Sequence, residues 1–458
     1  MVELTLIAVI AGIIGALAGL GGGVVLTPLL TLFLGIPIKY ATGASLVSSI
    51  STSAGSASVY VKQRMANDRI GISLVTATTA GAIIGSLLAN YTYSHGLTWI
   101  IYILFGAMLI FSIVPTVQRS TCELPPLKQP DRTTKIFRLY GTCYDQALKM
   151  WYRYWGVRWW LGWIIMLFAG IMSGLLGIGS GALKVLGMDW GMNIPMKVST
   201  TTSNFMIGVT AATSGSLYWF FGYISPVVAA CTALGVLLGA RIGTRMLIHV
   251  TNRQIRWFFV AILSYLGIEM VVRGLGREGI LTITSMESNI ISLAIGIAIL
   301  FSLYLVFGRM YTQTSDSTLS VYLTQMENPN KTEKRFIDIT SKVLKYGVII
   351  TAIFSISGLF LLFLHGEGMG IPLSTIVNLK LGVDTSLFGI NSILHYDAKL
   401  DGLSFILTGL LVLIAIPIVM VAINLVRFII EKDRLYIALA AITLLNLMIA
   451  ILIIPRVV

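Results

Sequence analysis

Two glycine clusters that interrupt apolar segments constrain the fold of this chain more than any other feature. The first is Gly19-Leu20-Gly21-Gly22-Gly23, and the second, Gly177-Ile178-Gly179-Ser180-Gly181, follows 158 residues later. Glycines at this density interrupt a helix. Irregular backbone at membrane depth is tolerated only where protein buries it or where it lines a cavity. Both clusters therefore predict broken helices inside a packed bundle.

The residues after each cluster repeat in the same order and without a gap. After the first cluster come Pro37, Lys39, Thr42 and Ser45, and after the second come Pro195, Lys197, Thr200 and Ser203. A glycine break at corresponding positions of two halves is the best sequence indication of a binding site in a helical membrane bundle. The chain is thus an internal repeat with a candidate site at the two breaks.

Composition places the chain in a membrane. Of its 458 residues, 56% are hydrophobic and 11% are charged, whereas soluble domains carry about 25% charged residues. Between Ile70 and Val117 there is no Asp, Glu, Lys or Arg. The net charge of +13 lies mostly in loops beside apolar runs, which is a topology signal and argues against a nucleic-acid partner. We expect an all-α polytopic protein that spans the cell membrane several times.

Charge also predicts the arrangement of the two halves. The segments 4–35 and 159–192 are each about one and a half spans long. If each is a re-entrant V, every main basic loop lies in the cytoplasm. Each half then has five segments, two arms and three helices, and the second half is inverted. We expect a first repeat at 1–117, a linker at 118–158 and a second repeat at 159–285.

The linker and the C-terminal part differ in character from the repeats. Residues 118–158 are basic and therefore expected to be cytoplasmic, and the interleaved aromatic and basic residues of 136–160 suit a helix lying in the membrane interface. Residues 286–458 lack the glycine motif and predict a second helical membrane domain. Its expected segments are a span at 290–307, a polar cytoplasmic stretch at 308–346, and spans at 347–364, 403–426 and 436–454.

The chemistry of the breaks favours an anion. Helix N-termini after a break present free N–H groups and the positive end of the helix dipole. The glycines have a simpler alternative role in close helix packing. The candidate binding residues are Gly21, Gly22, Gly23, Lys39, Thr42, Ser45, Gly179, Ser180, Gly181, Lys184, Lys197, Thr200, Ser203 and Asn204.

Lys184 is the most specific of these candidates, because its counterpart in the first repeat is Leu26. A lysine inside a membrane segment is a functional hypothesis by default. The alternatives are a structural pair with Asp189 and extension of the side chain to the surface. Lys39 and Lys197 have an alternative role as interfacial anchors.

Three further charged residues have open roles. Arg241 and Arg245 either line a cytoplasmic vestibule or only set the topology. Glu269 is either a coupling or a structural carboxylate.

Signals for an enzyme are absent from the sequence. There is no phosphate-binding GxxxxGK[ST] loop, the four histidines are scattered, and the three cysteines form no cluster with each other or with histidine. We therefore expect no catalytic residues, no cofactor and no metal.

The string GLGGGVVLTPLLTLFLGIPIKYATGASL, with its second copy GIGSGALKVLGMDWGMNIPMKVSTTTSN, resembles the sulfite exporter TauE/SafE family of membrane permeases. The resemblance covers about residues 4–274. It implies transport of small sulfur-containing anions such as sulfite or organosulfonates, mostly as export. The glycine clusters and the serines at 45 and 203 fall on the motif, and Ser180 departs from it where the first repeat has Gly22. The tail resembles a membrane domain of unknown function that accompanies such permeases.

We therefore expect a secondary transporter that moves a sulfur-containing anion by alternating access, and the resemblance implies that it is an exporter. An anion channel, an uptake permease and a non-transporting receptor subunit are the alternatives. Proton coupling and a homo-oligomeric state stay open.

Overall fold

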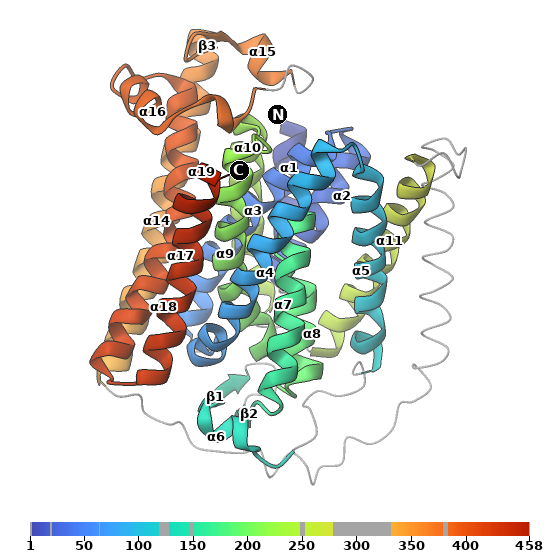
Figure 1. The fold of residues 1–458 in the computed structure, drawn as a ribbon, viewed down its shortest axis with the longest axis vertical. Coiled ribbons are helices and arrows are strands. Elements are labelled where there is room, and N and C mark those ends of the chain that lie inside the picture. The colour runs from blue at the N-terminus through green and yellow to red at the C-terminus, as the bar shows by residue number, and fades with distance from the viewer. Residues whose placement is uncertain are drawn as a thin grey trace.

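The computed structural model describes residues 2–18, 21–63, 65–118, 128–145, 150–247, 252–277, 331–378 and 383–457. The described part is a bundle of helices (Figure 1), of which six are long and apolar enough to cross a membrane. The predicted all-α polytopic class is confirmed. The expected span at 290–307 lies outside the described residues.

Each half contains the five expected segments. The first half comprises α1 (Val2–Ala18), α2 (Gly23–Phe33), α3 (Ile38–Lys62), α4 (Asp68–Ser94) and α5 (Thr98–Gln118). The second comprises α7 (Trp159–Leu176), α8 (Gly181–Leu186) with its π-helical continuation η1 (Gly187–Gly191), α9 (Met196–Phe220), α10 (Pro226–Leu247) and α11 (Asn252–Arg277). Helices α1 and α7 have 17 and 18 residues, and α2 has 11. A long arm and a shorter arm therefore flank each break.

Both broken segments return to the side from which they started. In the second half, the Val157 N–H donates to the Met192 carbonyl at 2.9 Å, so the beginning and the end of the V meet. In the first half, Thr5 near the start of α1 packs on Gly235 in the first half of α10, and Gly43 near the start of α3 packs on Tyr223, just before α10. The starts of α1 and α3 thus lie at the same end of α10.

Corresponding helices of the two halves run antiparallel, which makes the repeat an inverted one. Along α3 and α9, Gly43 contacts Tyr223 near one end, and the Thr201 hydroxyl donates to the Met65 carbonyl at 2.8 Å near the other. Midway, the Ser53 hydroxyl donates to the Asn204 carbonyl. The two Ser/Thr-rich helices are almost completely buried, so they need no apolar face toward lipid.

Close packing between the halves uses the glycines of the long arms. Gly12 of α1 lies against the Val236 backbone of α10, and Gly170 of α7 lies against the Thr78 backbone of α4. The second contact is the first one shifted by the repeat offset. A side chain at either glycine would collide with the facing helix, as expected for helices that approach closely through small residues.

The linker is not the interfacial helix that its composition suggested. After α6 (Arg132–Ile136), strands β1 (Tyr140–Asp145) and β2 (Met150–Trp155) form an antiparallel pair with Tyr140 opposite Trp155. Tyr152 and Tyr154 are buried while Arg153 between them is exposed. This two-residue alternation is the pattern of a half-buried strand, and it explains why the helical prediction was wrong.

The described residues of the C-terminal domain form three long helices: α14 (Lys331–His365), α17 (Gly402–Ile430) and α18 (Arg434–Met448), the last extended by η3 (Ile449–Ile453) and α19 (Ile454–Val457). The polar stretch expected up to residue 346 is helical from Lys331, because residues such as Thr340, Ser341 and Leu344 are buried and the Ser341 hydroxyl donates to the Ser58 carbonyl of α3 at 2.8 Å.

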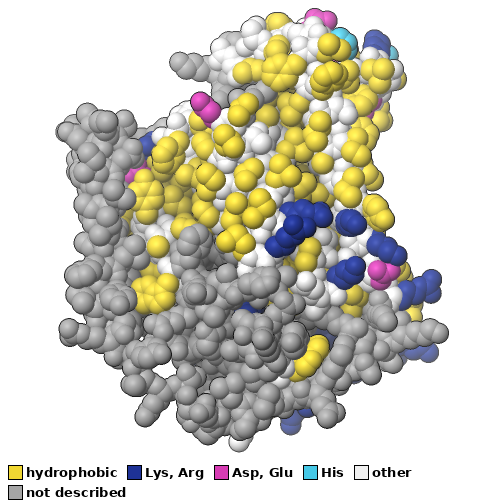
Figure 2. All heavy atoms as spheres, turned by 180° about the vertical axis from the view of Figure 1, so that it is seen from behind, with side chains coloured by type: hydrophobic (Ala, Val, Ile, Leu, Met, Phe, Trp, Pro, Cys, Tyr) yellow, Lys and Arg dark blue, Asp and Glu magenta, His cyan; other side chains and the backbone are white. Residues whose placement is uncertain are grey.

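A small cap joins α14 to α17. It contains β3 (Glu367–Gly368), β4 (Ile371–Pro372), α15 (Leu373–Val377), the 3-10 turn η2 (Thr385–Leu387) and α16 (Ile390–Asp397). Hydrophobic side chains cover much of the upper part of the face shown in Figure 2, and α14 exposes Ile353, Ile356 and Phe360. Such a surface suits contact with lipid.

Candidate functional site

Each glycine cluster contains two consecutive residues with positive φ at corresponding positions. Gly21 and Gly22 have φ values of 76° and 72°, and their counterparts Gly179 and Ser180 have 65° and 49°. This left-handed region costs a residue with a side chain about 1–2 kcal/mol, so Ser180 is held in a strained conformation. Helices α2 and α8 then begin with no side-chain cap, which leaves N–H groups without that partner.

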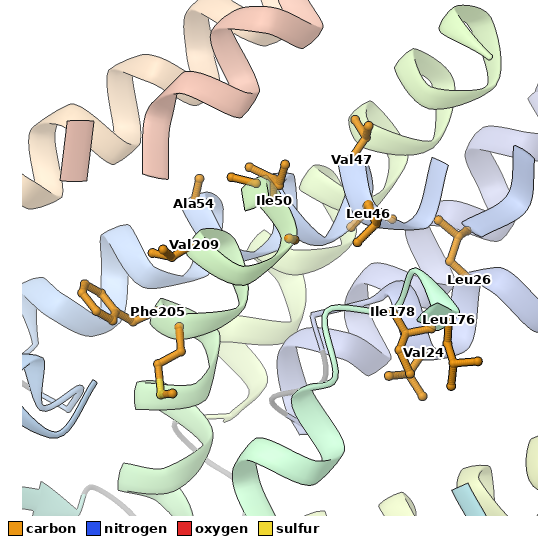
Figure 3. Packing of buried hydrophobic residues seen from close by; sticks show 14 of the residues in the cluster. Val24, Leu26, Leu46, Val47, Ile50, Ala54, Leu176, Ile178, Phe205 and Val209 are labelled. Carbon is orange, nitrogen blue, oxygen red and sulfur yellow. The ribbon is translucent and has the colours of Figure 1, made fainter. Parts of the chain in front are cut away.

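The structure brings the two breaks together between α3 and α9. Gly23 lies beside the Ile178 carbonyl, and Gly21 and Gly179 both pack on Ile207. In Figure 3, Val24 and Ile178 lie close together.

Serines of the following helices hold both breaks in the same way. The Ser45 hydroxyl donates to the Gly23 carbonyl at 3.0 Å, and the Ser203 hydroxyl donates to the Gly181 carbonyl at 3.4 Å. These two predicted residues therefore fix the breaks through backbone contacts.

Several buried polar atoms around the breaks have no hydrogen-bond partner among the described residues. They include the hydroxyls of Ser49, Ser180 and Thr200 and the Asn204 side-chain carbonyl. Ser49 lies directly against Gly23 and Gly179. Buried polar groups normally find partners, so an unpartnered group requires an explanation such as a ligand or water. Ser49 was not among the predicted residues, because it is one of many hydroxyl residues on α3.

Lys184 is fully buried beside the second break. Its ammonium donates to the Gly179 carbonyl and to the Thr210 hydroxyl, both at 2.8 Å. Among the described residues, Lys184 forms no salt bridge with a carboxylate. Its contacts are therefore not those of the structural pair with Asp189 that was one of the alternatives. An ammonium has three donor hydrogens, and the two contacts use two of them.

The polar group around Lys184 has no counterpart in the first repeat. The Thr210 hydroxyl lies 2.9 Å from the Thr78 hydroxyl of α4, so Lys184, Thr210 and Thr78 form a connected set, here called the polar triad. The corresponding positions are Leu26, Thr52 and Val236. In Figure 3, Leu26 lies in an apolar group with Leu176 and Val24. The site is therefore asymmetric in its side chains, although the breaks have positive φ at corresponding residues.

The remaining predicted residues lie at different depths. Thr42 packs on Gly177, and its hydroxyl is 3.0 Å from the Tyr93 hydroxyl. Lys39, at the start of α3, is half-buried with its ammonium 4.6 Å from the Tyr40 ring centroid, and Lys197 is buried at the start of α9. Each lysine is six residues, about 9 Å of helix, from the serine that holds the break. The structure does not bring these two lysines to the breaks.

The other charged residues lie away from the breaks. Arg241 and Arg245 are exposed on α10. Glu269 is fully buried and pairs with Arg273 at 3.0 Å, and Arg273 also donates to the carbonyls of Thr31 and Leu32, which end α2. These contacts give Arg273 a structural role. No group of three or more His, Cys, Asp or Glu in the described ranges is arranged to hold a metal.

Comparison with known proteins agrees with this architecture. A family profile described as "Sulfite exporter TauE/SafE" matches residues 4–270, and a profile for a "Protein of unknown function (DUF1634)" matches residues 340–452. The chain is 25% identical to the "Probable membrane transporter protein YunE" of Bacillus subtilis, over 60% of this chain and 98% of the relative. It is 25% identical to the "Probable membrane transporter protein MJ0441" of Methanocaldococcus jannaschii, over 59% and 94%. No solved structure matches.

Proposed function

Because this chain belongs to the sulfite exporter TauE/SafE family and is a multi-pass membrane transporter, we propose that it carries a small sulfur-containing anion, such as sulfite or an organosulfonate, out of the cell. The proposed site lies where the two breaks meet. The family description supports an anionic substrate, and the chemistry of the breaks supports the location.

The observation that carries this proposal is the fully buried Lys184 beside two uncapped helix starts. A buried ammonium without a carboxylate partner is costly in a membrane, and a bound anion would offset that cost. The unpartnered hydroxyls of Ser49 and Ser180 add neutral donors. Sulfonates stay anionic at neutral pH and provide several acceptor oxygens, which suits such a set of donors.

The inverted repeat supports alternating access as the mechanism. In transporters of this plan, one repeat rocks against the other around a site formed by broken helices at the repeat interface. The breaks here lie between α3 and α9, which come from different repeats.

The test is flux in proteoliposomes containing the purified full-length chain. The panel is sulfite, sulfate, thiosulfate, taurine, sulfoacetate and acetate. We expect flux of a sulfur-containing anion well above that of acetate. Lys184→Met should reduce it at least about tenfold, because a charge-assisted hydrogen bond contributes roughly 1.5–3 kcal/mol. Lys135→Met, which removes an exposed charge from α6, is the matched control.

Each alternative has its own outcome. Flux that responds to an opposing proton gradient supports a coupled carrier, whereas rapid flux that only follows the electrochemical gradient indicates a channel. Accumulation inside energised vesicles of native orientation indicates uptake. Binding of an anion without flux indicates a receptor subunit, and equal flux of acetate contradicts the substrate class.

A further inference from the structure

A second feature of the molecule is a cavity at the seam between the permease and the C-terminal domain. It lies among α3, α10, α14 and α17, and its apolar lining includes Leu234, Leu237 and Val348. Its wall also carries Thr351 and Ser355, whose buried hydroxyls have no partner among the described residues. The cavity is therefore apolar with two polar groups that lack a partner.

On each of three helices, the row of residues that lines the cavity leads to a basic residue on the side predicted to be cytoplasmic. On α3, Ser51 is followed at helical spacing by Ser58 and Lys62. On α10, Leu234 and Leu237 are followed by Arg241, and on α14 Lys345 precedes Val348. Residues three or four apart share one face of a helix, so each cation extends the face that lines the cavity.

Contacts between the helices place the three cations at similar depth. Leu237 of α10 packs on Gly55 of α3. The Ser341 hydroxyl of α14 donates to the Ser58 carbonyl of α3 at 2.8 Å, about one turn from Lys345 and from Lys62.

These cations form an exposed basic cluster, defined here as Lys62, Arg241 and Lys345. Within the described ranges none of the three has a salt bridge, whereas neighbouring Lys342 pairs with Asp338 at 2.8 Å. Figure 2 shows Lys and Arg side chains gathered on the lower half of one face, below a mainly hydrophobic surface. Basic residues at this depth meet the headgroups of the cytoplasmic leaflet.

We propose that the basic cluster and the adjoining seam between α10 and α14 bind one anionic phospholipid of the cytoplasmic leaflet. The basic cluster holds the phosphate, and an acyl chain lies along the apolar seam between α10 and α14, over the cavity of about 10 Å³. The charge of the cluster selects an anionic headgroup, and the apolar lining requires a chain attached to it, which a free phosphate lacks. The bound lipid contacts both the permease and the C-terminal domain and so joins them. The proposal is independent of the transported substrate.

The test is native mass spectrometry of the full-length chain in mixed micelles containing dioleoylphosphatidylglycerol or dioleoylphosphatidylcholine. We expect one phosphatidylglycerol to be retained in preference to phosphatidylcholine. The triple variant Lys62→Gln, Arg241→Gln, Lys345→Gln should lose this preference, by about fivefold for each cation removed. The matched control, called the hairpin control, removes three exposed cations from α6 and the adjoining hairpin: Arg132→Gln, Lys135→Gln, Arg153→Gln.

A second variant keeps the proposal testable if the triple variant unfolds. Ala352 lines the cavity at this seam, and Ala352→Leu fills the cavity while leaving every charge in place. We expect it to weaken retention of phosphatidylglycerol. Equal retention by wild type, the triple variant and Ala352→Leu would overturn the proposal. So would an equal loss in the hairpin control, or displacement of the lipid by glycerol 3-phosphate at a similar concentration.

Discussion

Arg427 is the central residue of an ion network that joins the C-terminal domain to the end of the permease predicted to be cytoplasmic. Its Nη1 lies 3.0 Å from the Asp68 carboxylate of α4, and its Nε lies 2.8 Å from Glu431. Arg69 adds a contact to Glu431 at 3.2 Å. The Arg427 side chain is only 6% exposed and that of Asp68 15%, so water screens this pair weakly.

The structure predicts unequal effects for the two partners. Arg427→Gln removes the cation that contacts both Asp68 and Glu431, although Arg69 still pairs with Glu431. Removal of one partner from a buried pair costs about 3 kcal/mol or more. Asp68→Asn leaves Arg427 with Glu431, so we expect a cost of about 1 kcal/mol, that of one hydrogen bond. The double variant should be no less stable than Arg427→Gln alone, which gives a coupling energy of about 1 kcal/mol.

The assay is thermal unfolding in detergent, followed with a dye that reacts with thiols as the buried Cys143 and Cys231 become exposed. Tyr140→Phe, at an exposed hairpin position, is the control and should melt like the wild type. Equal shifts for Asp68→Asn and Arg427→Gln, or strictly additive shifts in the double variant, would refute the network as described.

Three further predictions concern the cap of α6, the second glycine break and the packing of α7 on α4. The pKa of Asp131 lies below its ordinary value because, although partial burial opposes ionisation, hydrogen bonds from Thr133, the Arg158 N–H and Thr134 outweigh it. The contribution of Asp131 to stability is therefore complete above pH 3.8 and is lost as the pH falls through the lower pKa of the folded state, which hydrogen exchange of α6 should show. Asp131→Asn should abolish this pH dependence at a cost of about 1 kcal/mol, that of one hydrogen bond. Ser180→Gly should raise the melting temperature by relieving about 1 kcal/mol of strain, yet weaken anion binding measured by calorimetry; tighter binding would contradict a donor role for the hydroxyl. Gly170→Ala should cost about 1–3 kcal/mol through its collision with Thr78, while Gly389→Ala, which meets open space, should melt like the wild type.

The sequence predicted the parts of the fold that follow from periodic apolar runs and from charge. Sequence alone predicted the two breaks, the V-shaped segments and the inversion, because glycine clusters and basic loops are visible as local patterns. The hairpin of β1 and β2 was not predicted. Its strands alternate buried Tyr152 and Tyr154 with exposed Arg153, but the basic and aromatic composition was interpreted as an interfacial helix. The start of α14 was missed because its polar residues become helical through packing on α3.

At the site, Lys184 stood out because charge is rare in a membrane segment. Thr78 and Thr210 are neutral residues with no distinguishing spacing, and only the packing of α4 on α9 brings them to Lys184. The ion pair between Arg427 and Asp68 joins residues 359 positions apart, a separation over which local pattern carries no information.

The difference between the polar triad and its counterpart also bears on the resting state of the transporter. In an inverted repeat, the inward-open and outward-open forms interconvert when the two halves exchange conformations. Two identical halves would give these forms equal free energy. Lys184, Thr210 and Thr78 on one side and Leu26, Thr52 and Val236 on the other remove that equality. On the proposed alternating-access mechanism, the chain therefore prefers one access state, and exchanging Lys184 with Leu26 should shift that preference toward the other state.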